Sequence, residues 1–139
     1  MQIGIDLGAT KIEYVLLDND GKEVIRERRV SPTDYNSTLK SIEQIVLELD
    51  KKFNKKFEVG ICHPGSIPND SGLLKNAHNS PWLNNTYFQK DISEKINRNI
   101  FCENDANCFA LSESIDGSAK HYNIVFGVIL GSGCGGGLV

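Results

Sequence analysis

Short apolar segments separated by turn residues open the chain. Apolar side chains predominate in residues 3–7 and 12–17, while residues 23–30 are rich in charge. Residues 18–21, Asp-Asn-Asp-Gly, tolerate positive φ and so predict a hairpin turn between the second and third segments. We therefore expect three antiparallel strands, with the charged third strand near an edge of the sheet.

An amphipathic helix is expected next, because apolar residues recur at spacings of three and four. The residues on this stripe are Leu39, Ile42, Ile45, Val46, Leu49 and Phe53. Asn36 or Ser37 is expected to cap the helix N-terminus. Residues 57–62 predict a fourth strand, and a helix between two strands predicts a crossover that makes those strands parallel.

The rest of the chain alternates loops with shorter elements. Residues 63–87 form an irregular, polar segment, and a long loop within a compact domain is usually functional. The elements expected after it are a helix marked by Phe88, Ile92 and Ile96, a strand over 100–103, a helix from Asn104-Asp105 to Asp116-Gly117, a buried strand over 123–130, a glycine loop over 131–137 and a strand starting at Leu138-Val139. We expect the chain to be part of a longer protein.

Composition and charge argue against several classes of protein. Fifteen Lys and Arg against 18 Asp and Glu give a net charge of −3, which does not favour a nucleic-acid-binding surface. No apolar run approaches the roughly 18–20 residues of a membrane helix. The N-terminus shows no secretory leader, so a cytoplasmic location is expected. The four cysteines contain no CxxC pair, which favours free thiols over a zinc module.

The segment Gly4–Lys11 is a first candidate phosphate-binding loop. It runs from a strand into a tight turn, where Gly8 lets backbone N–H groups approach a phosphate and Thr10 adds a hydroxyl donor. Asp6 ends the strand, and a carboxylate there can hold Mg²⁺ directly or through water. An ordinary hairpin turn explains this segment equally well on spacing alone.

The segment Gly131–Gly137 is a second candidate. It formally matches GxGxxG, a dinucleotide-binding pattern. That fingerprint requires a helix after the glycines, whereas Leu138-Val139 is typical of a strand. A phosphate-facing hairpin is therefore favoured over a dinucleotide fold, and over a solvent turn, which would hardly need five glycines.

Two further polar segments are candidates for substrate chemistry. Glu103–Asn107 lies where a strand meets a helix, so Asp105 is either a base that accepts a proton from a substrate hydroxyl or a helix cap. The loop from Pro64 to Trp82 is rich in Asn, whose amides match sugar hydroxyls, and it offers an aromatic ring for an apolar sugar face. The same composition is typical of any surface loop.

Taken together and in this order, the four segments resemble the ROK family (repressor, open reading frame, kinase) of bacterial sugar kinases, within the actin-like and hexokinase-like ATPase superfamily. Gly4–Lys11 is similar to the first phosphate loop of the family, Gly131–Leu138 to the second and Glu103–Cys108 to its catalytic segment. The resemblance implies an α/β fold, namely a ribonuclease-H-like (actin/hexokinase-like ATPase) domain that has a mixed sheet with three antiparallel N-terminal strands and flanking helices. Residues 1–139 would be the N-terminal domain of a two-domain kinase. The C-terminal domain, with a zinc-binding segment, would lie beyond this chain.

The resemblance also implies a reaction, the phosphorylation of a hexose at its 6-hydroxyl by ATP with Mg²⁺, which this chain alone is not expected to perform. Asp105 would be the general base, and Gly65, Asn79 and Asn104 would contact the sugar together with Asp105. Asp6 would lie near the metal. The residues expected to contact the ATP phosphates are Gly4, Ile5, Asp6, Leu7, Gly8, Ala9, Thr10, Lys11, Gly131, Ser132, Gly133, Cys134, Gly135, Gly136, Gly137 and Leu138.

Pro64–Ile67 and Lys75–Asn84 look most like the fructokinase and mannokinase branch of the family. Fructose or mannose is therefore the expected substrate, with N-acetylglucosamine or glucose as the alternative, and a homo-oligomer is expected. Two alternatives of another class are a sugar-responsive regulator of the family and a sugar-binding module without turnover. Such regulators carry a helix-turn-helix ahead of the first phosphate loop, and that loop begins here at Gly4, which disfavours the regulator. Two features depart from the family pattern: Ala9 replaces a glycine, and Cys62-His63 precedes Pro-Gly.

Overall fold

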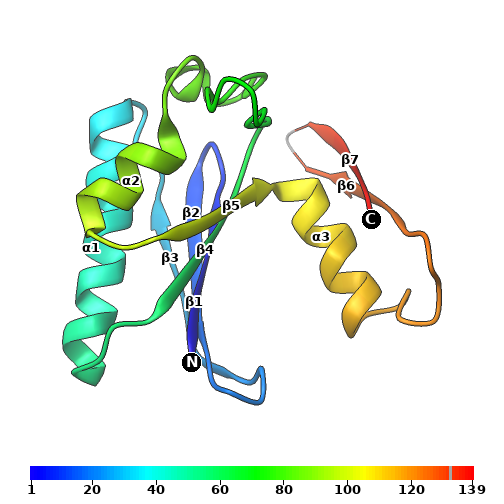
Figure 1. Cartoon of the computed structure of the whole chain (residues 1–139), viewed down its shortest axis with the longest axis horizontal. Helices are drawn as coiled ribbons and strands as arrows, with labels where there is room; N and C mark the ends of the chain where they lie inside the picture. The colour runs from blue at the N-terminus through cyan, green and yellow to red at the C-terminus, as the bar shows by residue number, and fades with distance from the viewer. Residues whose placement is uncertain (132) are drawn as a thin grey trace.

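The computed structural model describes residues 1–131 and 133–139, so Ser132 of the second glycine loop lies outside the described residues. The elements, drawn in Figure 1, are β1 (Gln2–Leu7), β2 (Lys11–Leu17), β3 (Glu23–Val30), α1 (Tyr35–Phe53), β4 (Glu58–His63), the 3₁₀ turn η1 (Pro81–Leu83), α2 (Phe88–Ile96), β5 (Ile100–Asn104), α3 (Asp105–Ile115), β6 (Phe126–Leu130) and β7 (Cys134–Leu138).

The main sheet has five strands in the order β3-β2-β1-β4-β5. β2 is antiparallel to both β1 and β3, whereas β1 and β4, and β4 and β5, are parallel. The expected three-stranded meander, the charged edge strand β3 and the crossover through α1 are confirmed. Because β1, β4 and β5 run in one direction, their carboxyl ends meet at the same edge of the sheet.

One face of this sheet is covered by α1 and α2 (Figure 1). Alternation along β1 buries Ile3, Ile5 and Leu7 in the shared core, each at most 2% exposed. The expected apolar stripe of α1 packs into the same core. Burying one such side chain contributes about 1.5–3 kcal/mol, so this layer is the main source of stability.

The first helix begins earlier than the sequence indicates. Asp34, rather than Asn36 or Ser37, is the N-cap, and its carboxylate accepts a hydrogen bond from the Ser37 N–H at 2.9 Å. The earlier start brings Tyr35 into the first turn, where its hydroxyl donates to Asp91 of α2 at 2.6 Å. This contact is distant in sequence, so no local pattern reports it.

The C-terminal strands differ most from expectation. The strand expected to be buried over residues 123–130 begins at Phe126, and its side chains are largely exposed: Phe126 is 67% and Leu130 80% exposed. The expected glycine loop is shorter, because Cys134–Leu138 form β7, which pairs antiparallel with β6 in a separate two-stranded sheet.

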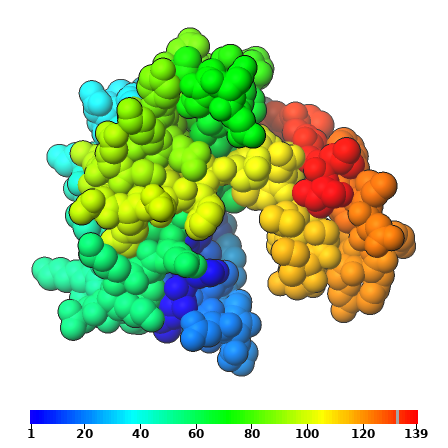
Figure 2. Space-filling model, viewed as in Figure 1, coloured from blue at the N-terminus to red at the C-terminus, as the bar shows by residue number. Residues whose placement is uncertain are grey.

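The β6–β7 hairpin packs on α3 rather than joining the main sheet. A Cβ atom at Gly127 would lie 3.0 Å from the Cβ of Ala110, so the strand and the helix approach closely there. The buried residues of the main core all come from the part of the chain between positions 3 and 100, so α3 and the β6–β7 hairpin lie outside this core. Figure 2 shows a hollow between the N-terminal strands, in blue, and α3, in yellow-orange. No helix within residues 1–131 and 133–139 has the length and apolar character needed to cross a membrane.

Candidate active site

A cavity of about 740 Å³ opens at the carboxyl edge of the parallel strands. It is lined by the turn between β1 and β2, two parts of the long loop, the first turn of α3 and the turn between β6 and β7. All four segments that the sequence singled out therefore meet at one place. They meet because β1, β4 and β5 end at the same edge and because the hairpin rests on α3.

The cavity does not include every residue expected to bind phosphate. Ile5 is buried in the main core, and Gly4 packs near Val15 of β2. Gly137 lies against the backbone of α3, and the Leu138 side chain is 64% exposed. The lining residues of the two loops are Asp6, Leu7, Gly8, Ala9, Thr10, Lys11, Gly131, Gly133, Cys134, Gly135 and Gly136.

The turn between β1 and β2 is tight at Gly8. Its N–H donates to the Lys11 carbonyl at 3.0 Å, and a Cβ atom at Gly8 would lie 2.9 Å from that same oxygen. A side chain there would open the turn. Ala9 is not among the described non-glycine residues with positive φ, so alanine in place of the family's glycine introduces no backbone strain.

The start of α3 separates the two roles that the sequence left open for Asp105. Asn104 is the N-cap, since its Oδ1 accepts hydrogen bonds from the N–H groups of Ala106 and Asn107 at 3.0 and 3.3 Å. The Nδ2 of Asn104 donates to the Gly65 carbonyl at 2.7 Å, which ties the helix start to the long loop. Asp105 follows the cap, and it lines the cavity.

Two carboxylates share the cavity. Burial raises the pKa of Asp6, and the negative charges of Asp105 and Glu13 raise it further, while Lys11 lowers it. Two neighbouring carboxylates that repel each other suit a hard divalent cation such as Mg²⁺. Among residues 1–131 and 133–139, no three His, Cys, Asp or Glu side chains gather into a metal-binding group, so Asp6 would need ligands from a bound phosphate and water.

The long loop is held in a defined shape beside the cavity. Ser66 and Lys75 exchange two backbone hydrogen bonds of 2.9 Å, and Asn76 adopts positive φ. The Asn84 amide then pairs with the backbone of Ala77: its Oδ1 accepts from the Ala77 N–H at 2.9 Å, and its Nδ2 donates to the Ala77 carbonyl at 3.4 Å. This clamp fixes the segment Asn76–Asn79, and Asn76, His78 and Asn79 line the cavity.

Trp82 is not the aromatic wall that the loop composition suggested. It lies in the 3₁₀ turn η1, is partly buried against the main core and does not line the cavity. Of the expected sugar contacts, Gly65, Asn79, Asn104 and Asp105 all line the cavity.

Replacing Asn84 by Ala is expected to destabilise the chain by about 1–3 kcal/mol. The Ala77 side chain is fully buried, and its N–H loses its partner in the variant. Urea unfolding measures the effect. Asn36→Ala is the matched control, because Asn36 is exposed in the first turn of α1, and that variant should stay within about 0.5 kcal/mol of the parent. Equal midpoints for the two variants would show that the clamp does not contribute.

Replacing Gly137 by Ala is expected to loosen the hairpin. The new Cβ would lie 2.1 Å from the Ala106 carbonyl oxygen and 2.6 Å from the Asn107 nitrogen, both backbone atoms of α3 that cannot move aside alone. Overpacking of this kind costs about 1–3 kcal/mol. Amide exchange in peptides that cover β6 and β7 should therefore accelerate by roughly 10-fold or more.

The control for the hairpin is Gly131→Ala, because a Cβ at Gly131 meets nothing within 4 Å. Exchange in β6 and β7 should then remain at the parent rate. If Gly137→Ala also leaves exchange unchanged, the hairpin does not rest on α3 as the structure indicates.

A pair of thiols escaped the sequence analysis. The side chains of Cys62 in β4 and Cys108 in α3 lie beside each other, and both are half-buried. The neighbouring Cys108 thiol and burial raise the pKa of Cys62, whereas the neighbouring Cys62 thiol lowers the pKa of Cys108. Their spacing in the sequence carries no signal, because the contact arises from the packing of α3 against the sheet.

Curated proteins similar to the chain are bacterial sugar kinases. The chain is 40% identical over 141 residues to N-acetyl-D-glucosamine kinase of Escherichia coli O127:H6. This match covers 100% of the chain and 46% of that enzyme. The chain is 39% identical over 145 residues to N-acetyl-D-glucosamine kinase of Haemophilus influenzae, with the same coverage. The chain thus spans about half the length of these relatives.

Solved structures give the same picture. A ROK family glucokinase from Streptomyces griseus, in complex with glucose and AMPPNP, has a TM-score of 0.86 at 25% identity, over 99% of this chain and 44% of that one. The inorganic polyphosphate/ATP-glucomannokinase from Arthrobacter sp. strain KM has a TM-score of 0.85 at 28% identity, over 99% and 57% of the two chains.

These neighbours confirm the expected fold class, an α/β domain of the actin/hexokinase-like type with a mixed sheet and flanking helices. The sequence model of the ROK family matches residues 2–139, nearly the whole chain. The chain belongs to the ROK family.

Proposed function

We propose that the chain supplies one wall of the active site of an ATP-dependent hexose 6-kinase, with Asp105 as the general base. The observation that carries this proposal is the position of Asp105. Its side chain lines the cavity together with both glycine turns and the Asn-rich loop, while Asn104 caps the helix. A carboxylate there can accept the proton of a sugar hydroxyl as its oxygen attacks the γ-phosphate of ATP.

The phosphates of ATP would lie between the two turns. Gly8 and Thr10 line one side, and Gly133, Gly135 and Gly136 line the other. Glycines allow the backbone to approach phosphate oxygens closely, and backbone N–H groups bind them. Mg²⁺ near Asp6 would neutralise phosphate charge, and it would relieve the repulsion from Asp105 that helps to raise the pKa of Asp6.

The sugar would lie between the long loop and α3. Asn79 and the Asn104 amide, which keeps one free N–H after binding the Gly65 carbonyl, are suited to sugar hydroxyls. Gly65 has no side chain, so its backbone can approach the sugar closely. Because Asn104 contacts both Gly65 and the start of α3, the same residue couples the sugar loop to the position of the base.

We propose N-acetylglucosamine as the first substrate to test. The relatives at 39–40% identity are N-acetyl-D-glucosamine kinases, which supports the substrate that the sequence offered as an alternative. The preference for fructose or mannose expected from Lys75–Asn84 finds no support among them. Glucose stays in the panel, since the Streptomyces griseus neighbour is a glucokinase.

The experiment is a steady-state assay of the full-length protein with ATP, Mg²⁺ and four sugars: N-acetylglucosamine, glucose, fructose and mannose. Product position is determined by NMR. The highest kcat/KM for N-acetylglucosamine, with phosphate on the 6-oxygen, is the expected result. Sugar binding without ATP consumption for any of the four would contradict the kinase proposal and favour a binding module or regulator.

We further propose a cytoplasmic homo-oligomer without nucleic-acid or membrane partners. Three apolar side chains are each more than 60% exposed: Ile115 of α3, Ile124 just before β6, and Phe126 of β6. Their exposure supports further protein packing over this side of the molecule. Light scattering of the full-length protein measures the oligomeric state, and a monomer at all concentrations would contradict the proposal.

A further inference from the structure

Strand register places Cys62 directly under the proposed active site. Cys62 lies opposite Asp6 on β1 and opposite Glu103 on β5. Its neighbours along β4, Ile61 and His63, are buried on the helix-covered face. Alternation therefore turns Cys62 to the other face of the sheet, the face on which the Asp6 and Glu103 side chains project.

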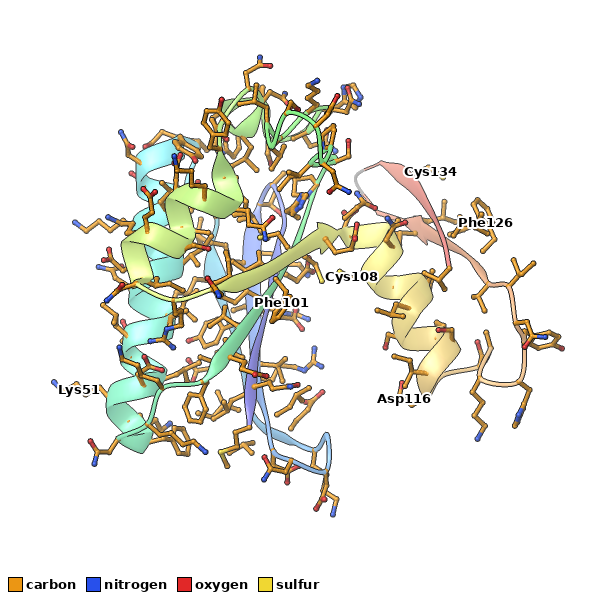
Figure 3. All side chains as sticks on the ribbon, in the orientation of Figure 1. Lys51, Phe101, Cys108, Asp116, Phe126 and Cys134 are labelled. Carbon is orange, nitrogen blue, oxygen red and sulfur yellow. The ribbon has the colours of Figure 1, made fainter. Side chains whose placement is uncertain are left out.

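Helix geometry brings Cys108 to the same point. Cys108 is three residues after Asp105, so the two side chains lie on one face of α3. Figure 3 shows Cys108 in the first part of α3, where the helix adjoins the sheet. The thiols of Cys62 and Cys108 are neighbours where β4 contacts α3, the helix that carries Asp105.

We propose that Cys62 and Cys108 are an oxidative modification site, a dithiol that hydrogen peroxide closes into an intramolecular disulfide. Cys108 loses its thiol proton to solvent, and its sulfur attacks peroxide. An S–O bond forms, the O–O bond breaks and the leaving hydroxide takes a proton to become water. The Cys62 sulfur then attacks the sulfenic sulfur, an S–S bond forms and a second water leaves. Two thiols and one peroxide thus give one disulfide and two waters.

The other cysteines are poorly placed for this reaction. Cys102 packs against the main core on the helix-covered face, and burial raises its pKa to about 12, which keeps it protonated. Cys134 is exposed on β7, across the cavity. A mixture of disulfides is therefore not expected, and the contact between Cys62 and Cys108 determines the partner.

The disulfide would alter the site because it joins the base-bearing turn of α3 to β4. An S–S bond of about 2.05 Å is much shorter than a contact between two unbonded sulfur atoms, so closure draws the two backbones together. A displacement near 1 Å at a reacting group costs about 10²-fold in rate. This consequence, unlike the disulfide itself, rests on the proposed kinase function.

The first test uses this chain and needs no activity. The parent, Cys62→Ser, Cys108→Ser and the control Cys134→Ser are treated with hydrogen peroxide, alkylated and mapped by mass spectrometry. The parent and Cys134→Ser should lose two hydrogen atoms and yield a Cys62–Cys108 cross-linked peptide that dithiothreitol reverses. Cys62→Ser and Cys108→Ser should yield none. Free Cys62 and Cys108 in the oxidised parent, or a disulfide to Cys102 or Cys134, would overturn the proposal.

The second test uses the full-length protein. Peroxide should lower sugar phosphorylation by about 100-fold in the parent, dithiothreitol should restore it, and Cys62→Ser should resist the loss. A mapped disulfide with unchanged turnover would overturn the regulatory consequence. If the reduced protein phosphorylates no sugar, the kinase proposal fails, while the disulfide mapping still decides the dithiol proposal.

Discussion

Asp105→Asn is expected to lower sugar phosphorylation by the full-length protein by about 10²–10⁴-fold. The amide keeps the size of the side chain but cannot accept the proton of the attacking hydroxyl. Folding should change little, because Asn104 and not Asp105 caps α3, and Asn retains an oxygen for the Ala106 N–H that Asp105 now binds at 2.8 Å. A loss of turnover without a loss of stability separates a base from a structural residue.

The measurement combines steady-state kinetics with urea unfolding. Asp116→Asn is the matched control, since Asp116 is an exposed carboxylate at the other end of the same helix. Its turnover should stay within about two-fold of the parent, because surface substitutions are usually near neutral. Turnover near the parent value in Asp105→Asn would assign Asp105 to the helix start alone.

Elements with a local pattern were predictable from the sequence. The alternation in β1 and the stripe of α1 each bury one side of an element, so apolar spacing reports them directly. The β6–β7 hairpin had no such pattern. In Gly135–Gly137 no side chain marks a face, and the segment becomes a strand because its bare backbone fits against the first turn of α3. Phe126 and Leu130 are apolar yet exposed, so hydrophobicity wrongly indicated burial there.

The content of the candidate site was predictable, but the division of roles within it was not. Parallel strands end at one edge, which is why Asp6, Gly65 and Asp105, far apart in sequence, line one cavity. Spacing could not decide between Asn104 and Asp105 as the cap, because both residue types cap helices equally well. The Asn84 clamp and the contact between Cys62 and Cys108 depend on tertiary packing, so neither leaves a trace in the sequence.

Gly65→Ala is expected to destabilise the chain by about 2–5 kcal/mol, more than Gly137→Ala. Gly65 has a φ of +80°, which L-residues rarely adopt. The added Cβ would also lie 2.2 Å from the Lys75 carbonyl oxygen and 2.9 Å from the Ala77 nitrogen. Both are backbone atoms of the clamped loop, so the turn itself must move.

A movement of the turn at Gly65 would be passed to Asp105, the proposed base, through hydrogen bonds. The Gly65 carbonyl accepts the Asn104 amide, and the next residue, Ser66, pairs with Lys75. Urea unfolding of this chain tests the prediction against Gly60→Ala. A Cβ at Gly60 meets nothing within 4 Å and its φ is not positive, so that variant should unfold within about 1 kcal/mol of the parent. Equal urea midpoints for Gly65→Ala and Gly60→Ala would mean that the long loop can accommodate a side chain at position 65 without loss of stability. The Asn104 bridge would then not hold the sugar loop and the base in one rigid arrangement.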